Sequence, residues 1–141
     1  MGVHDSYGKR ALRKACELAG DRIAWSGHSY AICDGITCNL DAILESGIVV
    51  EIESRVDKQV HGAMLDLLMH PASAKLMVLI PAHMNNAAKT KSMCEGIAAT
   101  LAPTARFLCC VLCGAGHAEQ PDKDSRIVAA AINDLSQRQI G

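Results

Sequence analysis

The sequence predicts a single mixed α/β domain in which helices flank one sheet in three layers. Three observations predict this fold class. Helical and strand patterns follow one another in the order α, β, β, β, α, β, α, β, α. Two Ile- and Val-rich stretches are separated by a turn that ends in glycine, which predicts an antiparallel hairpin. Two later, short apolar runs alternate with helical patterns, which is typical of parallel strands joined by crossover helices.

The individual elements follow from local signals. Residues 8–19 show apolar positions at helical spacing, and Gly20 ends that helix. Asp34-Gly35 is a strong turn signal before the hairpin. The chain has 141 residues, half of them hydrophobic and only 3% aromatic, so we expect one domain, 1–141, with an aliphatic core. Helices are predicted at 8–19, 54–70, 86–101 and 124–139, and strands at 23–32, 36–44, 48–53, 75–80 and 106–112.

Composition limits the classes of function. Seven cysteines is an odd number, no signal-peptide pattern stands at the N-terminus, and no apolar run approaches the length of a bilayer span. These features predict a cytoplasmic protein with reduced thiols and no membrane partner. The net charge of -1 gives no overall field that attracts nucleic acid. A basic stripe on the first helix is our candidate for phosphate contacts, although a solvated helix face has the same pattern: Lys9, Arg10, Arg13 and Lys14.

The hairpin at 36–53 carries the acidic residues on which the functional prediction depends. The loop at 45–47 ends in Gly47, and a three-residue loop commonly needs glycine there because its last residue is left-handed. In that register Asp41 lies opposite Glu51, and Glu53 lies two residues further along the same face. A two-residue loop would instead shift the register by one residue and separate the acids.

A lysine follows these acids at the start of the next helix. Ser54 and Asp57 resemble a capping box, with Ser54 as the N-cap. Lys58 would then lie in the first helical turn, near the carboxyl end of the strand that carries Glu51 and Glu53. Its position fits either solvation or a contact with the carboxylates. The Glu-x-Glu pattern is also typical of a solvated strand face.

Together these residues resemble the PD-(D/E)xK nuclease superfamily, which has the restriction-endonuclease-like fold. The resemblance covers roughly residues 9–81 and rests on the α-β-β-β-α-β order, Asp41, the Glu51-Ile52-Glu53 strand and Lys58. Two features depart from the family pattern. Leu40 stands where the family has proline, and Glu53 stands where it usually has lysine. Some members carry that lysine on the following helix, which Lys58 would match.

The resemblance implies Mg²⁺- or Mn²⁺-dependent hydrolysis of phosphodiesters by a DNA endonuclease. Asp41, Glu51 and Glu53 would be the metal-binding acids, with the Ile52 carbonyl as a further ligand. Glu53 would position or deprotonate the attacking water, and Lys58 would orient it or stabilise developing charge. A chain of 15.0 kDa that cuts two strands would act as a homodimer or with a partner subunit.

Three other interpretations stay open at this point. The chain could be a noncatalytic, dimeric binding or scaffold module that keeps the nuclease-like fold while its acids point apart or form salt bridges. Cys110, Cys113 and His117 have zinc-like spacing, but they make only half a motif and follow a predicted buried strand. Glu17 matches the location of an accessory acid in some family members, and a surface pair with Arg13 explains it equally well.

Overall fold

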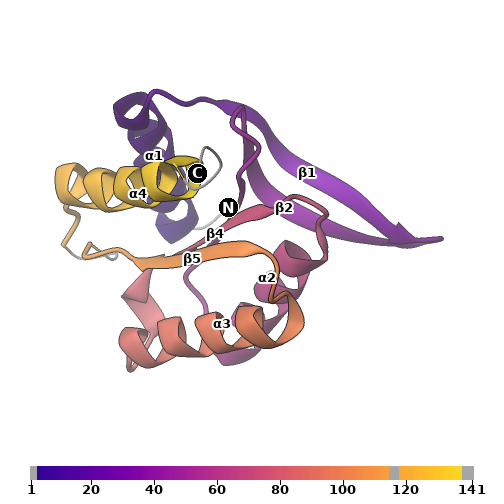
Figure 1. Ribbon diagram of the computed structural model, residues 1–141. Coiled ribbons are helices and arrows are strands. Elements are labelled where there is room, and N and C mark those ends of the chain that lie inside the picture. The colour runs from indigo at the N-terminus through magenta and orange to yellow at the C-terminus, as the bar shows by residue number, and fades with distance from the viewer. Residues whose placement is uncertain (1–2, 115–117, 138–141) are drawn as a thin grey trace.

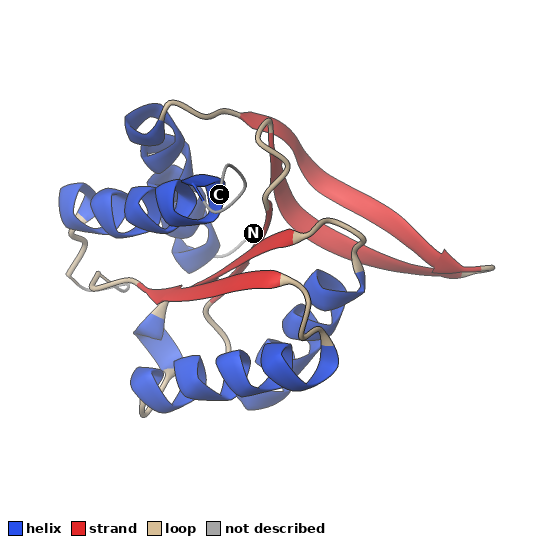
Figure 2. Cartoon of the chain, viewed as in Figure 1, coloured by secondary structure: helices blue, strands red, loops and turns tan. Residues whose placement is uncertain are grey.

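A five-stranded sheet runs through the middle of the molecule in the order β1-β2-β3-β4-β5 (Figures 1 and 2). The computed structural model describes residues 3–114 and 118–137. The first three strands pair antiparallel, and the last three pair parallel. The mixed sheet predicted from the sequence is therefore confirmed. The strands are β1 (Ile23–Cys33), β2 (Ile36–Leu44), β3 (Val49–Glu53), β4 (Ala74–Leu79) and β5 (Arg106–Val111).

Helices cover both faces of this sheet and complete three layers. Figure 1 shows α1 and α4 packed side by side on one face and α2 and α3 on the other. A one-turn 3₁₀ helix, η1 (Pro81–His83), follows β4. Among the described residues no helix is both long enough and apolar enough to span a membrane. The helices are α1 (Val3–Ala19), α2 (Asp57–Met69), α3 (Ala87–Leu101) and α4 (Pro121–Gln137).

Three predicted helix starts were wrong. Helix α1 begins at Val3, five residues before the predicted start at residue 8. Helix α2 begins at Asp57, and its N-cap is Val56, whose side chain makes no capping hydrogen bond. The capping box predicted from Ser54 therefore does not form. Instead the Ser54 backbone N–H donates to the carboxylate of Glu53. Helix α4 begins at Pro121 rather than Asp124, because proline suits the first helical turn, where its missing N–H is not needed.

Two hydrophobic cores hold the layers together, one on each face of the sheet. Every residue of β4 is buried, as expected for a central parallel strand with helices on both sides. Val50 and Ile52 of β3 belong to the core beneath α1 and α4, whereas Val49 belongs to the core beneath α2 and α3. Because side chains alternate along a strand, Glu51 and Glu53 point to the α2 and α3 side.

A glycine brings α1 close to the strand that carries these acids. A Cβ placed on Gly8 would lie 2.5 Å from the side chain of Ile52 and 2.8 Å from that of Ile80. Glycine lets the helix backbone lie this close to the side chains of Ile52 in β3 and of Ile80, which follows β4. The approach positions Asp5, one helical turn earlier, at the edge of the cavity described below.

Strands β1 and β2 continue well beyond the rest of the sheet as a two-stranded arm (Figure 1). Their pairing runs from Ile23 and Leu44 to Cys33 and Ile36. In contrast, β3 pairs with β2 only through Val49 and Val50. Strands β2 and β3 therefore separate just after these pairs, and the candidate site lies at the separation.

Candidate functional site

The hairpin has the register that the sequence predicted. Gly47 has φ 95°, in the left-handed region that favours glycine. The Leu44 N–H donates to the Ile48 carbonyl at 2.9 Å, which closes a three-residue loop. Ala42 pairs with Val50. Continuing this register by one residue places Asp41 opposite Glu51.

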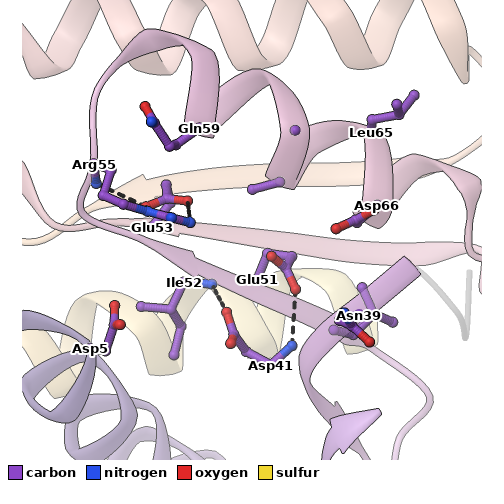
Figure 3. A pocket seen from close by; sticks show the side chains of 13 residues that line it. Asp5, Asn39, Asp41, Glu51, Ile52, Glu53, Arg55, Gln59, Leu65 and Asp66 are labelled. Atoms are coloured by element: carbon purple, nitrogen blue, oxygen red, sulfur yellow. Dashed lines mark hydrogen bonds and ion pairs between the residues drawn. The ribbon is translucent and has the colours of Figure 1, made fainter. Parts of the chain in front are cut away.

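At this position, carboxylates replace the hydrogen bonds of the ladder between β2 and β3. The Asp41 backbone N–H donates to Glu51 Oε1 at 2.9 Å, and the Ile52 N–H donates to Asp41 Oδ2 at 2.7 Å (Figure 3). Asp41 of β2 is thus held by a backbone N–H of β3, and Glu51 of β3 is held by a backbone N–H of β2. Asp41 and Glu51 are held beside each other even though the backbones have moved apart.

Both acids open into a cavity of about 650 Å³ between the sheet and α2 (Figure 3). Acidic groups from four elements line it, together with the amides of Asn39 and Gln59. Arg55 is the one lysine or arginine among the described lining residues. The acidic residues are Asp5 from α1, Asp41 from β2, Glu51 and Glu53 from β3, and Asp66 from α2.

Burial and crowding make Glu51 unusually hard to ionise. Only 7% of the residue is exposed. Burial, and after it the negative charge of Asp41, raise the pKa of Glu51 to about 9. Burial also raises the pKa of Asp41, although the Ile52 N–H and the charge of Lys9 oppose this. In the absence of a cation, the pair therefore resists carrying two negative charges.

Asp66 adds to the negative potential on the α2 side of the cavity. Burial raises the pKa of its carboxyl group, and a hydrogen bond from the Asn39 backbone opposes the shift. Its charge is a further cause of the raised pKa of Glu51. Figure 3 shows Asp66 on the opposite side of Glu51 from Glu53.

Glu53 differs from the other acids because an arginine neutralises it. The residue is 2% exposed. Arg55 donates to it through Nε at 3.0 Å and Nη2 at 2.9 Å, and the Ser54 and Arg55 backbone N–H groups add two bonds of 2.9 Å. Burial alone would raise the pKa of Glu53, but the hydrogen bonds and charge of Arg55 outweigh it and lower the pKa.

Lys58 does not take part in this arrangement. It lies in the first turn of α2, as expected, but its side chain is exposed and it is not among the residues that line the cavity. The cation that pairs with one of the carboxylates is Arg55, which contacts Glu53. The structure therefore brings Asp41, Glu51 and Glu53 to one cavity and leaves Lys58 outside it.

The donor set limits how a metal could bind. Within residues 3–114 and 118–137, no three side chains of His, Cys, Asp or Glu come together closely enough to hold an ion. Glu53 is occupied by Arg55, which leaves Asp41 and Glu51 as the adjacent oxygen donors. Mg²⁺ is commonly held by one or two carboxylates, with water and phosphate at its other positions. Two carboxylates in an open, acid-lined cavity therefore fit such an ion.

The other candidate residues lie elsewhere. In the basic stripe, Arg10 pairs with Glu119 at 3.1 Å, and Lys14 lies 3.8 Å from Asp122, so two of its four charges face acids near the start of α4. Glu17 is exposed and does not line the acidic cavity, and the structure describes no ion pair between it and Arg13.

The cysteine motif gives no metal site in the described part of the chain. Cys110 is half-buried in β5 and Cys113 is exposed, while His117 lies outside the described residues. The neighbouring Cys109 instead lies with Cys94 in the core beneath α2 and α3. These two thiols act as small hydrophobic residues.

Sequence reasoning missed three charged residues that line the cavity. Asp66 follows Gln59 by seven residues on α2, so helical spacing alone would have placed both on one face. Arg55 stands two residues after Glu53, close enough to pair with it once the strand ends. Asp5 had no such signal, because its position depends on how α1 packs against β3.

Comparisons with known proteins give no relative for this chain: no protein-family model, no curated protein and no solved structure matches it.

Proposed function

We propose that this chain is a divalent-cation-dependent phosphodiesterase of the restriction-endonuclease-like fold that cuts DNA. The observation that carries the proposal is the adjacent pair of half-buried Asp41 and buried Glu51, whose carboxyl groups are linked through the backbone of the opposite strand and both have raised pKa values. Two acids in this state are best accommodated by a cation that lets both ionise. The α-β-β-β-α-β order and the mixed sheet support the fold part of the proposal.

In this proposal, Asp41 and Glu51 hold the cation, with the Ile52 carbonyl as a further ligand. When bound, the cation neutralises charge on the phosphate and lowers the pKa of a water molecule. Glu53 orients that water. Its pKa is lowered by Arg55, so it is a poor proton acceptor and is better suited to accepting a hydrogen bond.

Arg55 takes the role that the family resemblance gives to a lysine. Its side chain is 67% exposed although it holds the buried carboxylate of Glu53. A guanidinium group has five N–H donors, and those not used by Glu53 can bind a phosphate oxygen. Arg55 thus links the buried acid to the position of the substrate.

Nicking of supercoiled plasmid in Mg²⁺ or Mn²⁺ tests the proposal. The wild type should nick, and Asp41→Asn, which keeps an oxygen to accept the Ile52 N–H, should lose at least about 100-fold in rate. Asp122→Asn is the matched control, because Asp122 is exposed on α4 and lies outside the cavity. Equal nicking by Asp41→Asn and Asp122→Asn would overturn the proposal.

One observation favours the alternative, a noncatalytic binding module. The ion pair between Glu53 and Arg55 neutralises one of the acids, as that interpretation expects. It predicts no nicking by any variant and no binding of Mn²⁺ that depends on Asp41. Nicking that disappears in Asp41→Asn would exclude it.

A further inference from the structure

A second cavity, of about 740 Å³, adjoins the acidic one. It lies between the first turns of α2 and α3 and the segment that follows η1. Arg55 lines both cavities, so a ligand that extends across Arg55 can occupy both. The second cavity is therefore next to the position at which the proposed function places the reacting phosphate.

The charges of the two cavities are opposite. Five acids line the first, whereas none of the described residues around the second is acidic. The cationic side chains are Arg55 and Lys89, and His61 also lines the cavity. No ion pair joins Lys89 to another residue that the structure describes, and its side chain is exposed. This side of the cavity is thus complementary to an anion such as phosphate.

Apolar side chains form the rest of the wall. Val56 is 49% exposed although it is a large hydrophobic residue. Met84 and Met93 are only partly buried, and both line the cavity. Methionine side chains adapt to flat, polarisable groups. An apolar wall beside a cationic rim has the two properties that a nucleotide needs, one for its base and one for its phosphate.

We infer that the second cavity binds the nucleotide adjacent to the reacting phosphate. The base of this nucleotide leaves the helical stack and packs against Met84 and Met93, and its phosphate lies toward Lys89 and Arg55. This inference rests on the proposed function. A paired base cannot enter a cavity while it remains in the duplex. The preferred substrate is therefore a single strand, or duplex that is frayed or locally melted as in a supercoiled plasmid, rather than fully paired duplex DNA.

Fluorescence anisotropy with labelled DNA tests the inference. A short single strand and a hairpin duplex of the same length are titrated into protein that carries Glu51→Gln, which prevents cutting under the proposed function. The single strand should bind more tightly. Adding Lys89→Ala should weaken its binding about fivefold and reduce the salt dependence by about one unit. Lys91→Ala, on the same helix but outside the cavity, is the matched control and should change binding little.

A second variant fills the space instead of removing charge. Thr90→Trp should remove the preference for single strands while leaving the thermal unfolding temperature nearly unchanged, because Thr90 is at the open cavity wall. Equal affinity for both DNAs, or equal effects of Lys89→Ala and Lys91→Ala, would overturn the inference even if the plasmid is nicked. Binding that depends on Lys89, with no nicking by the wild type, would support the nucleotide site and overturn the nuclease.

Discussion

The backbone N–H of Asp41 donates a hydrogen bond of 2.9 Å to the carboxylate of Glu51, one residue beyond the last backbone pair between β2 and β3. In return, Asp41 accepts from the N–H of Ile52. The two acids thus bridge the strands that carry them, and both line the same cavity. The raised pKa values, the proposed cation and the predictions below all depend on this arrangement.

Glu51→Gln should stabilise the protein at alkaline pH. The pKa of Glu51 is raised from its ordinary value to about 9, so the folded protein favours the neutral carboxyl group. The stability that this preference contributes is fully present below about pH 4.5 and is lost as pH rises toward 9. Glutamine keeps an oxygen for the Asp41 N–H and carries no charge. We expect a gain of about 1–3 kcal/mol in the free energy of unfolding at pH 8 and little gain at pH 4.5.

Urea unfolding at the two pH values measures this gain. Glu17→Gln is the control, because Glu17 is exposed and outside the cavity. A gain of the same size at pH 4.5 and pH 8 would show that ionisation of Glu51 is not its cause.

Arg55→Met should destabilise the protein at neutral pH. It leaves the buried carboxylate of Glu53 with only the backbone N–H donors of residues 54 and 55. We expect a cost of about 1–2 kcal/mol, less than for a fully buried pair because Arg55 is largely exposed. Because the pKa of Glu53 is lowered, its carboxylate stabilises the fold at pH values above the ordinary pKa of glutamate. That contribution is lost as pH falls, so the cost of Arg55→Met should be smaller in acid.

Chemical denaturation at pH 7.5 and pH 4 tests the Arg55 prediction. Arg22→Met is the comparison. It breaks the ion pair between Arg22 and Glu45, in which both side chains are exposed. If Arg55→Met costs no more than Arg22→Met at pH 7.5, the Arg55 pair does not hold the buried acid.

Gly47→Ala should weaken the hairpin that sets the register of the acids. Alanine at φ 95° is strained, so we expect a loss of about 1–2 kcal/mol. Gly96→Ala in α3 is the opposite case: a Cβ there meets nothing within 4 Å, and alanine is the better helix former by about 1 kcal/mol. Thermal unfolding should thus shift in opposite directions for the two variants. A shift in the same direction would contradict the three-residue loop.

A separate buried network should show strong coupling. Asp124 is fully buried and accepts hydrogen bonds from the Tyr7 hydroxyl at 2.5 Å, the Cys113 N–H at 2.6 Å and the Gly114 N–H at 2.8 Å. Tyr7→Phe should cost about 1 kcal/mol and Asp124→Ala about 3 kcal/mol. Because they share one hydrogen bond, the double variant should cost less than the sum, as a double-mutant cycle will measure. Strict additivity would mean that the two groups act independently.

The sequence predicted the fold class and hairpin well because they depend on local signals. Apolar periodicity located β2 at its observed residues, and Gly47 fixed the loop length. The predicted start of α2 failed because the chain becomes helical only after Val56, the observed N-cap, so Ser54 lies two residues too early to cap the helix. Arg55 and Asp5 were missed for a different reason, since their roles depend on where a strand ends and how closely a helix packs. Local sequence patterns do not predict such contacts between elements that are distant in the sequence.

Calorimetric titration of Mn²⁺ at pH 8 tests the central claim most directly, because a cation that binds between Asp41 and Glu51 must displace the proton that the raised pKa of Glu51 retains. The wild type and Asp122→Asn should bind one ion with a heat that changes with the ionisation enthalpy of the buffer, and Asp41→Asn should lose that binding. Binding that is unchanged in Asp41→Asn, or no binding by the wild type, would contradict the account.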